Sequence, residues 1–150
     1  MAAKLSAVGA SKARLRALGQ ALRRAGSAGY LANDPVDVSY LSNFSGDDSW
    51  LFVPARGRAT LLTDFRYAED AAADCPHLAV RLRTLPLAKE AARLASRRQG
   101  PLAFNPDHLT VAGRKRLVQL LGAGGVSELP QVVADMRATK DSAEVAAIER

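Results

Sequence analysis

The sequence has a single cysteine, eight aromatic residues and no long apolar run. Because Cys75 has no second cysteine to pair with, a disulfide-stapled secreted scaffold is excluded. No apolar run approaches the roughly 18 residues that a membrane-spanning helix needs, so we expect no membrane partner. The remaining composition, 24% charged and 48% hydrophobic over 150 residues, predicts a single globular domain.

Acidic residues are missing before Asp34, and the whole chain carries a formal net charge of +6. A basic start that is rich in Ser and Ala is also found in mitochondrial transit peptides. The apolar face formed by Leu15, Leu18 and Leu22 instead favours a short tail followed by a helix with a cationic outer surface. We therefore expect a cytoplasmic protein.

Two basic clusters raise the question of nucleic-acid binding. Arg97-Arg98 and Arg114-Lys115-Arg116 have no aromatic neighbours for base stacking, and both fall on expected helices. A solvated helix face is the usual explanation for such clusters. We expect no nucleic-acid partner. A basic nucleic-acid-binding domain is the weakest of the function classes that the sequence leaves open.

Apolar periodicity and turn residues predict strands that alternate with helices. Ser11 has the position of a helix N-cap, and Gly26 that of the residue that ends the helix. Pro54 and Gly57 separate two apolar strands, as in a β-hairpin. The expected helices cover about residues 11–25, 35–41, 64–73, 86–99 and 110–121, and the strands cover 29–32, 49–53, 59–63, 78–82, 102–104 and 126–129. This order predicts an α/β layered domain with a mixed sheet.

No complete catalytic constellation is found in the sequence. His77 and His108 each lack a second ligand at helical or hairpin spacing, so a metal site built on them is not expected. Cys75 lies in a Cys-Pro-His turn, which is a poor scaffold for a thiolate–imidazole pair. A glycine-rich loop at 122–125 follows a helix instead of opening one, so it lacks the helix N-terminus of a phosphate site. We expect neither catalytic residues nor metal ligands in this chain.

The last residues carry a helix-start signal and no stop signal. Asp141 and Glu144 have the spacing of a capping box, and Val145 and Ile148 begin an apolar face. No glycine or proline follows them. We therefore expect the chain to be the front part of a longer protein.

Three motifs resemble the N-terminal domain of the creatinase/prolidase family, in that family's order and at about its spacing. The stretch Tyr30–Gly46 is similar to the family's YLTGFTG region, although Asn43 replaces the glycine usual before Phe44. Leu62–Tyr67 resembles the family's TD-x-RY motif. Met136–Ile148 resembles the LRxxKDxxEIxxI segment that joins this domain to a pita-bread metallopeptidase domain.

The resemblance implies a three-layer α/β/α domain with a mixed sheet of about five to six strands, of the ribonuclease H-like, creatinase N-terminal type. It divides the chain into a flexible tail at residues 1–10, the domain at 11–138, and at 139–150 a linker with the truncated first helix of an absent catalytic domain. That absent domain is expected to bind two divalent metal ions (Mn, Co or Zn) through two Asp, one His and two Glu.

The parent protein implied by the resemblance is an Xaa-Pro aminopeptidase or Xaa-Pro dipeptidase, and the 150-residue chain itself is expected to be inactive. Its expected partners are the C-terminal pita-bread domain and further copies in a homodimer or higher homo-oligomer. The same architecture resembles relatives with other roles, so a creatinase-like hydrolase or a peptide- or histone-binding module is the alternative.

One set of residues is predicted to wall the substrate pocket of the parent enzyme, because loops that follow adjacent strands gather at one edge of a layered sheet. These pocket-wall residues are Asn33, Asp34, Phe44, Asp47, Asp48 and Trp50. Large aromatic side chains that are not buried need a neighbouring surface to cover them. The alternative for Phe44 and for Trp50 is simple core packing.

A second set, Asp64, Arg66 and Tyr67, is predicted to be structural. Asp64 follows a strand and can accept a backbone N–H at the start of the next helix. Arg66 and Tyr67 then fix that helix on the sheet by hydrogen bonds and ring packing. The alternative for Arg66 is that it binds a substrate carboxylate.

Overall fold

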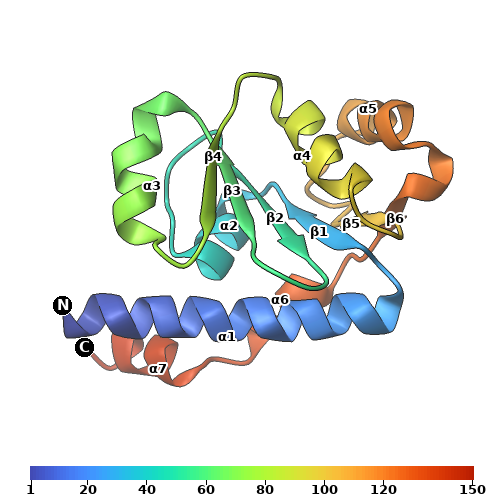
Figure 1. Cartoon of the computed structure of the whole chain (residues 1–150). Helices are drawn as coiled ribbons and strands as arrows, with labels where there is room; N and C mark the ends of the chain where they lie inside the picture. The colour runs from blue at the N-terminus through green and yellow to red at the C-terminus, as the bar shows by residue number, and fades with distance from the viewer.

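The computed structural model describes residues 1–142 and 144–150, which form one six-stranded mixed sheet covered by helices (Figure 1). The strand order in the sheet is β4-β3-β2-β1-β5-β6. The strands are β1 (Gly29–Ala32), β2 (Trp50–Pro54), β3 (Thr60–Thr63), β4 (Ala79–Leu82), β5 (Leu102–Phe104) and β6 (Val126–Glu128). The helices are α1 (Ala2–Ala25), α2 (Pro35–Ser42), α3 (Ala68–Asp74), α4 (Leu87–Ser96), α5 (Val111–Leu121), α6 (Val132–Ala138) and α7 (Ser142–Ile148), with 3-10 turns η1 (Phe65–Tyr67) and η2 (Ala123–Gly125).

The sheet separates two apolar clusters, one on each face. The larger cluster packs α1, α2, α3 and α6 against alternate strand residues such as Tyr30 and Leu51. The smaller cluster packs α4 and α5 against the intervening residues, among them Leu31 and Phe52. Since neighbouring strand residues point to opposite faces, the two clusters define three layers. The predicted α/β/α arrangement with a mixed sheet is confirmed.

Strand β1 occupies the centre of the sheet and is buried along its whole length. It pairs antiparallel with β2 and parallel with β5. At Gly29 a Cβ atom would lie 2.8 Å from Cε2 of Phe52 and 3.0 Å from the carbonyl oxygen of Val53. Glycine at this position therefore permits the close approach of β1 and β2.

The first helix begins earlier than the sequence predicted. Helix α1 starts at Ala2, so residues 2–10 are helical instead of forming a tail, and the N-cap expected at Ser11 is wrong. The preceding residues are rich in alanine, which has the highest helix propensity. Ser11 lies in the middle of α1, and its side chain is buried. Its Oγ donates to the Leu41 carbonyl and lies 2.7 Å from Nε2 of His77. No described helix is long and apolar enough to cross a membrane.

Most of the residues that the sequence predicts to begin or end a helix, or to form the hairpin turn, are confirmed in these roles. Gly26 ends α1 with a left-handed φ of 71°, and Gly57 turns the β2–β3 hairpin with a φ of 104°. The side chains of Asp34 and Thr110 accept hydrogen bonds from backbone amides in the first turns of α2 and α5. Helix α6 was not predicted, and it starts without a side-chain cap.

Arg14 holds α1 against two other helices. Its Nη1 donates to the Tyr40 carbonyl of α2 at 2.8 Å, and its guanidinium carbon lies 4.1 Å from the centre of the Tyr40 ring. Its Nε donates to Oδ2 of Asp141 at 2.8 Å. Asp141 and Glu144 form the predicted capping box at the start of α7. The assignment of this helix to a following domain stays a prediction.

The side chain of Glu90 on α4 is fully buried and ion-paired. Its Oε2 accepts from Nε of Arg81 at 2.7 Å, and Oε1 accepts from the Thr84 amide at 3.2 Å. Burial by itself would raise the pKa of Glu90, but the Thr84 amide and the Arg81 guanidinium outweigh it and hold the pKa below its usual value. The carboxylate thus ties α4 to the end of β4.

We predict that Glu90→Ala lowers the free energy of unfolding by about 2–3 kcal/mol at neutral pH. This loss is smaller than the loss expected when one member of a fully buried ion pair is removed. The Arg81 side chain is 38% exposed, so its guanidinium stays partly hydrated when Glu90 is removed. Because the folded-state pKa of Glu90 is lowered, its contribution is present above the unfolded pKa and is lost as the pH falls through the folded one. Urea unfolding from neutral to acidic pH should therefore show wild type and variant converging in acid. Equal stability of Glu90→Ala and the exposed control Glu69→Ala at neutral pH would contradict this.

Candidate functional site

The polar residues singled out by the sequence gather at one edge of the sheet. Leu31 of β1 pairs with Phe104 of the parallel strand β5, so both strands end at this edge. Trp50 of β2 pairs with Leu62 of β3, so β2 starts where β3 ends. Strands β4 and β6 run parallel to β3 and β5 and end there as well. We call this side, with the loops that leave it, the carboxyl edge.

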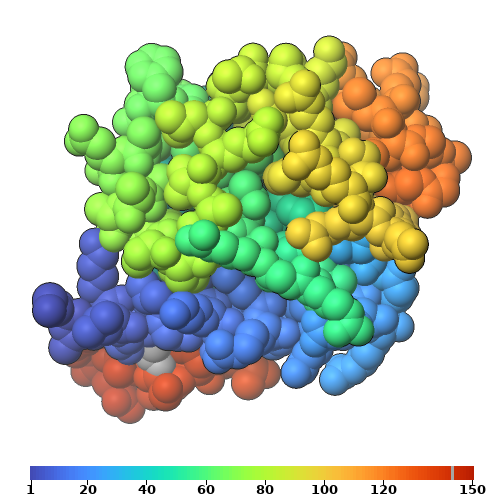
Figure 2. Space-filling model, in the orientation of Figure 1, coloured from blue at the N-terminus to red at the C-terminus, as the bar shows by residue number. Residues whose placement is uncertain are grey.

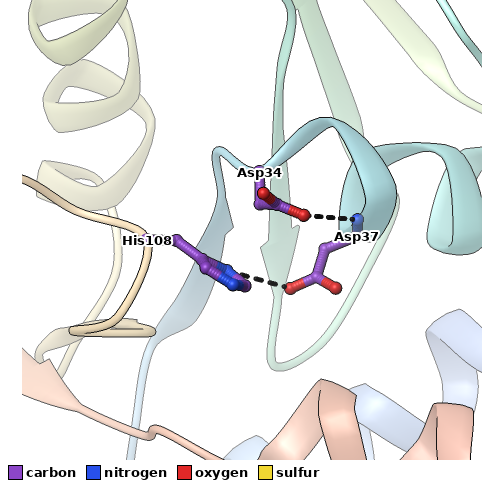
Figure 3. A group of neighbouring side chains, drawn as sticks. All are labelled: Asp34, Asp37 and His108. Atoms are coloured by element: carbon purple, nitrogen blue, oxygen red, sulfur yellow. Dashed lines mark hydrogen bonds and ion pairs between the residues drawn. The ribbon is translucent and has the colours of Figure 1, made fainter.

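Three ionisable side chains meet at the carboxyl edge between β1, α2 and the loop after β5 (Figure 3). Asp34 caps α2, its Oδ2 accepting from the amides of Val36 at 3.1 Å and Asp37 at 3.3 Å. The Pro35 ring at the first helical position suits this start, because proline lacks the amide hydrogen that would be unpaired there. Nδ1 of His108 lies 3.4 Å from Oδ2 of Asp37.

Asp37 is the buried member of this group, with only 3% of its side chain exposed. Nη1 of Arg137, from α6, lies 3.4 Å from its other carboxylate oxygen. Burial raises the pKa of Asp37, while the neighbouring His108 and Arg137 act in the opposite direction. Burial, together with the nearby Asp37 and Asp34 carboxylates, also raises the pKa of Tyr30. The group therefore connects α2, α6 and the β5–α5 loop through one desolvated carboxylate.

Sequence reasoning identified Asn33 and Asp34 here but missed Asp37, and it considered His108 only as an isolated ligand. The amide Nδ2 of Asn33 donates to the His108 carbonyl at 2.8 Å, which brings the β1–α2 and β5–α5 loops together. In the sequence, Asp37 stands four residues before Leu41, on the apolar side of the predicted short helix, and an acid at such a position could have drawn attention to it.

A second polar group surrounds Asp64, at the end of β3. Its Oδ1 accepts from the Arg66 amide at 2.9 Å, and its Oδ2 accepts from Nη2 of Arg66 at 2.7 Å. These hydrogen bonds from Arg66 lower the pKa of Asp64. Nη2 of Arg66 also lies 3.5 Å from Asp48, and its guanidinium carbon is 5.3 Å from the centre of the Tyr67 ring. All of these contacts lie within the domain, and the structural role of Asp64, Arg66 and Tyr67 stays a prediction.

The two aromatic pocket-wall residues lie in different places. Phe44 is 2% exposed and packs edge-on against Tyr67, with ring centres 5.9 Å apart. It therefore has almost no surface to offer a neighbouring domain, and its predicted place in a pocket wall does not agree with this burial. Trp50 is half-buried beside the smaller cluster on the other face of the sheet.

The loop between these aromatics keeps its carboxylates at the surface. Asp47 and Asp48 are both exposed, and Asp48 has a left-handed φ of 51°. At Gly46 a Cβ atom would lie 2.4 Å from Cζ of Phe44 and 3.1 Å from Cδ1 of Tyr67. The missing side chain allows the loop to cross the two rings and present both aspartates at the carboxyl edge.

Comparison with known proteins gives a consistent result. The creatinase/prolidase N-terminal domain family matches residues 14–139. The chain is 31% identical to the N-terminal domain of the cytoplasmic peptidase PepQ from Mycobacterium tuberculosis H37Rv, with a TM-score of 0.75 over 83% of this chain and 98% of that one. No curated protein sequence gives a significant match.

Two further structures share the fold at lower identity. An Xaa-Pro dipeptidase from Bacillus anthracis is 22% identical, with a TM-score of 0.82 over 91% of this chain and 38% of that one. The aminopeptidase P, an Xaa-Pro aminopeptidase, from Streptococcus thermophilus is 19% identical, with a TM-score of 0.75 over 85% of this chain and 98% of that one. The chain thus spans little more than a third of the B. anthracis dipeptidase. With the fold, the three motifs and the matched length in agreement, the chain belongs to the creatinase/prolidase N-terminal domain family.

Proposed function

We propose that this chain is the N-terminal, non-catalytic domain of a proline-specific metallopeptidase, either an Xaa-Pro aminopeptidase or an Xaa-Pro dipeptidase. The observation that carries the proposal is the match, over 83% of this chain and 98% of the other, to the N-terminal domain of the M. tuberculosis peptidase PepQ. This chain covers only 38% of the length of the B. anthracis dipeptidase, which supports a further, catalytic domain in the parent protein. We propose that residues 139–150 form the linker to this domain and the start of its first helix.

The two divalent metal ions implied for the parent enzyme do not fit the residues of this chain. Asp34, Asp37 and His108 are the one described group that offers three ligand atoms within 4.8 Å of one another. Oδ2 of Asp34 already accepts two backbone hydrogen bonds. The Arg137 guanidinium beside Asp37 would repel a metal cation. No step of peptide hydrolysis is therefore assigned to these residues.

We propose that the carboxyl edge walls the substrate pocket of the parent enzyme. Asn33 and Asp34 leave β1 at this edge, and Asp47, Asp48 and Trp50 precede or begin β2 beside them. The exposed carboxylate of Asp47 can attract the free amino group of a peptide. Asp34 and Asp48 keep their loops in place through the α2 cap and the Arg66 pair. This edge would then contribute charge and shape, while the chemistry belongs to the catalytic domain.

We also propose that the parent protein is a cytoplasmic homodimer or higher homo-oligomer. The M. tuberculosis relative PepQ is described as cytoplasmic, which supports the location. Size-exclusion chromatography with light scattering on the parent protein tests the assembly.

We predict that the purified chain retains only substoichiometric Mn, Co or Zn and does not hydrolyse Xaa-Pro dipeptides. The physical reason is that the carboxylates of the described three-ligand group are occupied by amide and guanidinium donors. Elemental analysis after dialysis checks the metal content, and a proline-release assay checks the activity. Near-stoichiometric metal or turnover by the chain alone would overturn the non-catalytic assignment.

We predict that Asp47→Asn in the complete enzyme raises KM by about two- to fivefold and leaves kcat unchanged, the effect of losing one exposed charge interaction. Trp50→Ala should also raise KM. The Asp47 effect should fade at high salt, because the interaction is screened. Asp70→Asn, an exposed acid on α3, is the matched control. If KM and kcat are the same in all of these proteins, the carboxyl edge has no part in substrate binding.

We predict that Arg66→Ala in the complete enzyme lowers the temperature of unfolding and changes turnover by less than about twofold, since the guanidinium is committed to Asp64 within the domain. Thermal unfolding and steady-state kinetics, measured on the same preparation, separate the two effects. Arg24→Ala, an exposed arginine of α1, serves as the control. A large loss of turnover on an undamaged fold would assign Arg66 to a substrate carboxylate instead.

A further inference from the structure

A groove of about 300 Å³ runs between α1 and the turn that joins β2 to β3. The two segments lie side by side on the face that Figure 2 shows, at the end of the sheet opposite the carboxyl edge. Its lining includes five arginine or lysine side chains and no carboxylate. They are Lys12, Arg16 and Arg23 of α1, and Arg56 and Arg58 of the turn. We call this feature the basic groove.

The cations of the basic groove have no acidic partner among the described residues, and five of them line one space. In the described residues, Lys4, Arg14, Arg66, Arg81, Arg114 and Arg137 each form an ion pair with an Asp or a Glu. None of the five groove cations lies within 4.0 Å of a described carboxylate. Their mutual repulsion is therefore relieved only by solvent and by ions from outside the chain.

Two of these side chains, Arg23 and Arg58, are held in place by backbone carbonyls. The Arg23 guanidinium donates to the Ala55 carbonyl in the turn. Nη2 of Arg58 donates to the Leu78 carbonyl at 2.8 Å, and its Nε donates to the His77 carbonyl at 3.3 Å. Neutral carbonyls fix the position of a guanidinium without cancelling its charge. The cationic wall is therefore partly ordered before a ligand arrives.

Glycine at position 19 brings the turn close to α1. A Cβ atom there would lie 3.2 Å from the Ala55 carbonyl oxygen and 3.3 Å from Nη1 of Arg23. The small residue lets the charges of the helix and those of the turn line one narrow space.

A histidine that lines the groove, His77, lies in the field of the same positive charges. Burial lowers the pKa of His77, and the positive charges of Lys12 and Arg58 lower it further. Its Nε2 lies against Oγ of Ser11, while its Nδ1 is buried without a hydrogen-bond partner among the described residues. The end of the groove near Lys12 thus disfavours an additional positive charge.

We propose that the basic groove is a binding site for a compact polyanion, specifically a di- or triphosphate group. Arginine guanidinium groups match phosphate oxygens with paired hydrogen bonds, and several of them at one site favour a ligand with several negative charges. The lining contains no Phe, Tyr or Trp, so it lacks the large aromatic rings on which bases of a single-stranded nucleic acid stack. Inorganic polyphosphate and a nucleoside triphosphate carry the same group, and the site would recognise the phosphate chain that they share.

Calorimetric titration of the chain with inorganic tripolyphosphate at low salt tests the proposal. The test variant is Arg16→Glu with Arg56→Glu, since neither side chain makes a described hydrogen bond or ion pair within the domain. The control is Lys115→Glu with Arg116→Glu on α5, which changes the net charge equally outside the groove. We expect the Kd to rise at least about tenfold in the test variant and less than about threefold in the control. Thermal unfolding of both variants verifies that the fold is retained.

The position of the ligand is checked by amide chemical shifts. Tripolyphosphate should shift the resonances of Gly19 and Gly57, which line the groove, and leave those of α5 unchanged. A titration with ATP separates the two sources: equal affinity indicates recognition of the phosphate chain, and tighter binding of ATP indicates a nucleotide. Equal weakening in the two variants, shifts spread over the whole basic surface, or tighter binding to duplex DNA than to tripolyphosphate would each overturn the proposal.

Discussion

The pairing of β1 on both of its edges is the constraint on which the rest of the domain depends. One edge of the strand pairs with β2, the first strand of the antiparallel hairpin, and the other pairs with the parallel strand β5, which in turn pairs with β6. Both of its faces are covered, since Tyr30 points into the larger apolar cluster and Leu31 into the smaller one. Four residues thus hold both halves of the sheet and both helical layers. A slip of one position in β1 would exchange the two faces and disrupt every layer at once.

The two ends of the sheet differ in how their charged residues are compensated. At the carboxyl edge most ionised groups are compensated within the domain, as Asp37 is by His108 and Arg137. At the other end, the basic groove exposes cations that no described carboxylate neutralises. The first end is built to hold loops in a fixed arrangement. The second retains electrostatic free energy that an external anion can lower.

The parts of the fold that the sequence predicted are those with strong local signals. Asp34, Asp64 and Thr110 cap the helices that follow them, and Gly26 ends α1, because each effect acts within a few residues. Alternating apolar residues likewise located the strands, and the order of the elements indicated the mixed sheet. These features need no knowledge of distant partners.

The parts that were missed depend on long-range contacts or on competing signals. Ser11 has the chemistry of a cap, but the alanine-rich residues before it are helical and its hydroxyl binds the distant Leu41 carbonyl. Helix α6 is short and uncapped, so little in its own sequence marks it. Asp37 is joined to Arg137 from 100 positions away, and spacing along the chain gives no indication of such a meeting. Membership of the family was accessible from the motifs, whereas the basic groove required the folded arrangement of α1 against the turn.

The hydrogen bonds between Arg14 and Asp141 have a consequence for the order in which the domain is completed during synthesis. The two residues are 127 positions apart. A ribosome adds about 5–20 residues per second, so Arg14 waits roughly 6–25 s before Asp141 has even been made. During that interval α1 can pack on α2 and on the sheet, whose residues are synthesised earlier, but its α7 flank remains open to water and to other chains. Among the helices that pack on α1, α7 is therefore the last to reach it on a nascent chain.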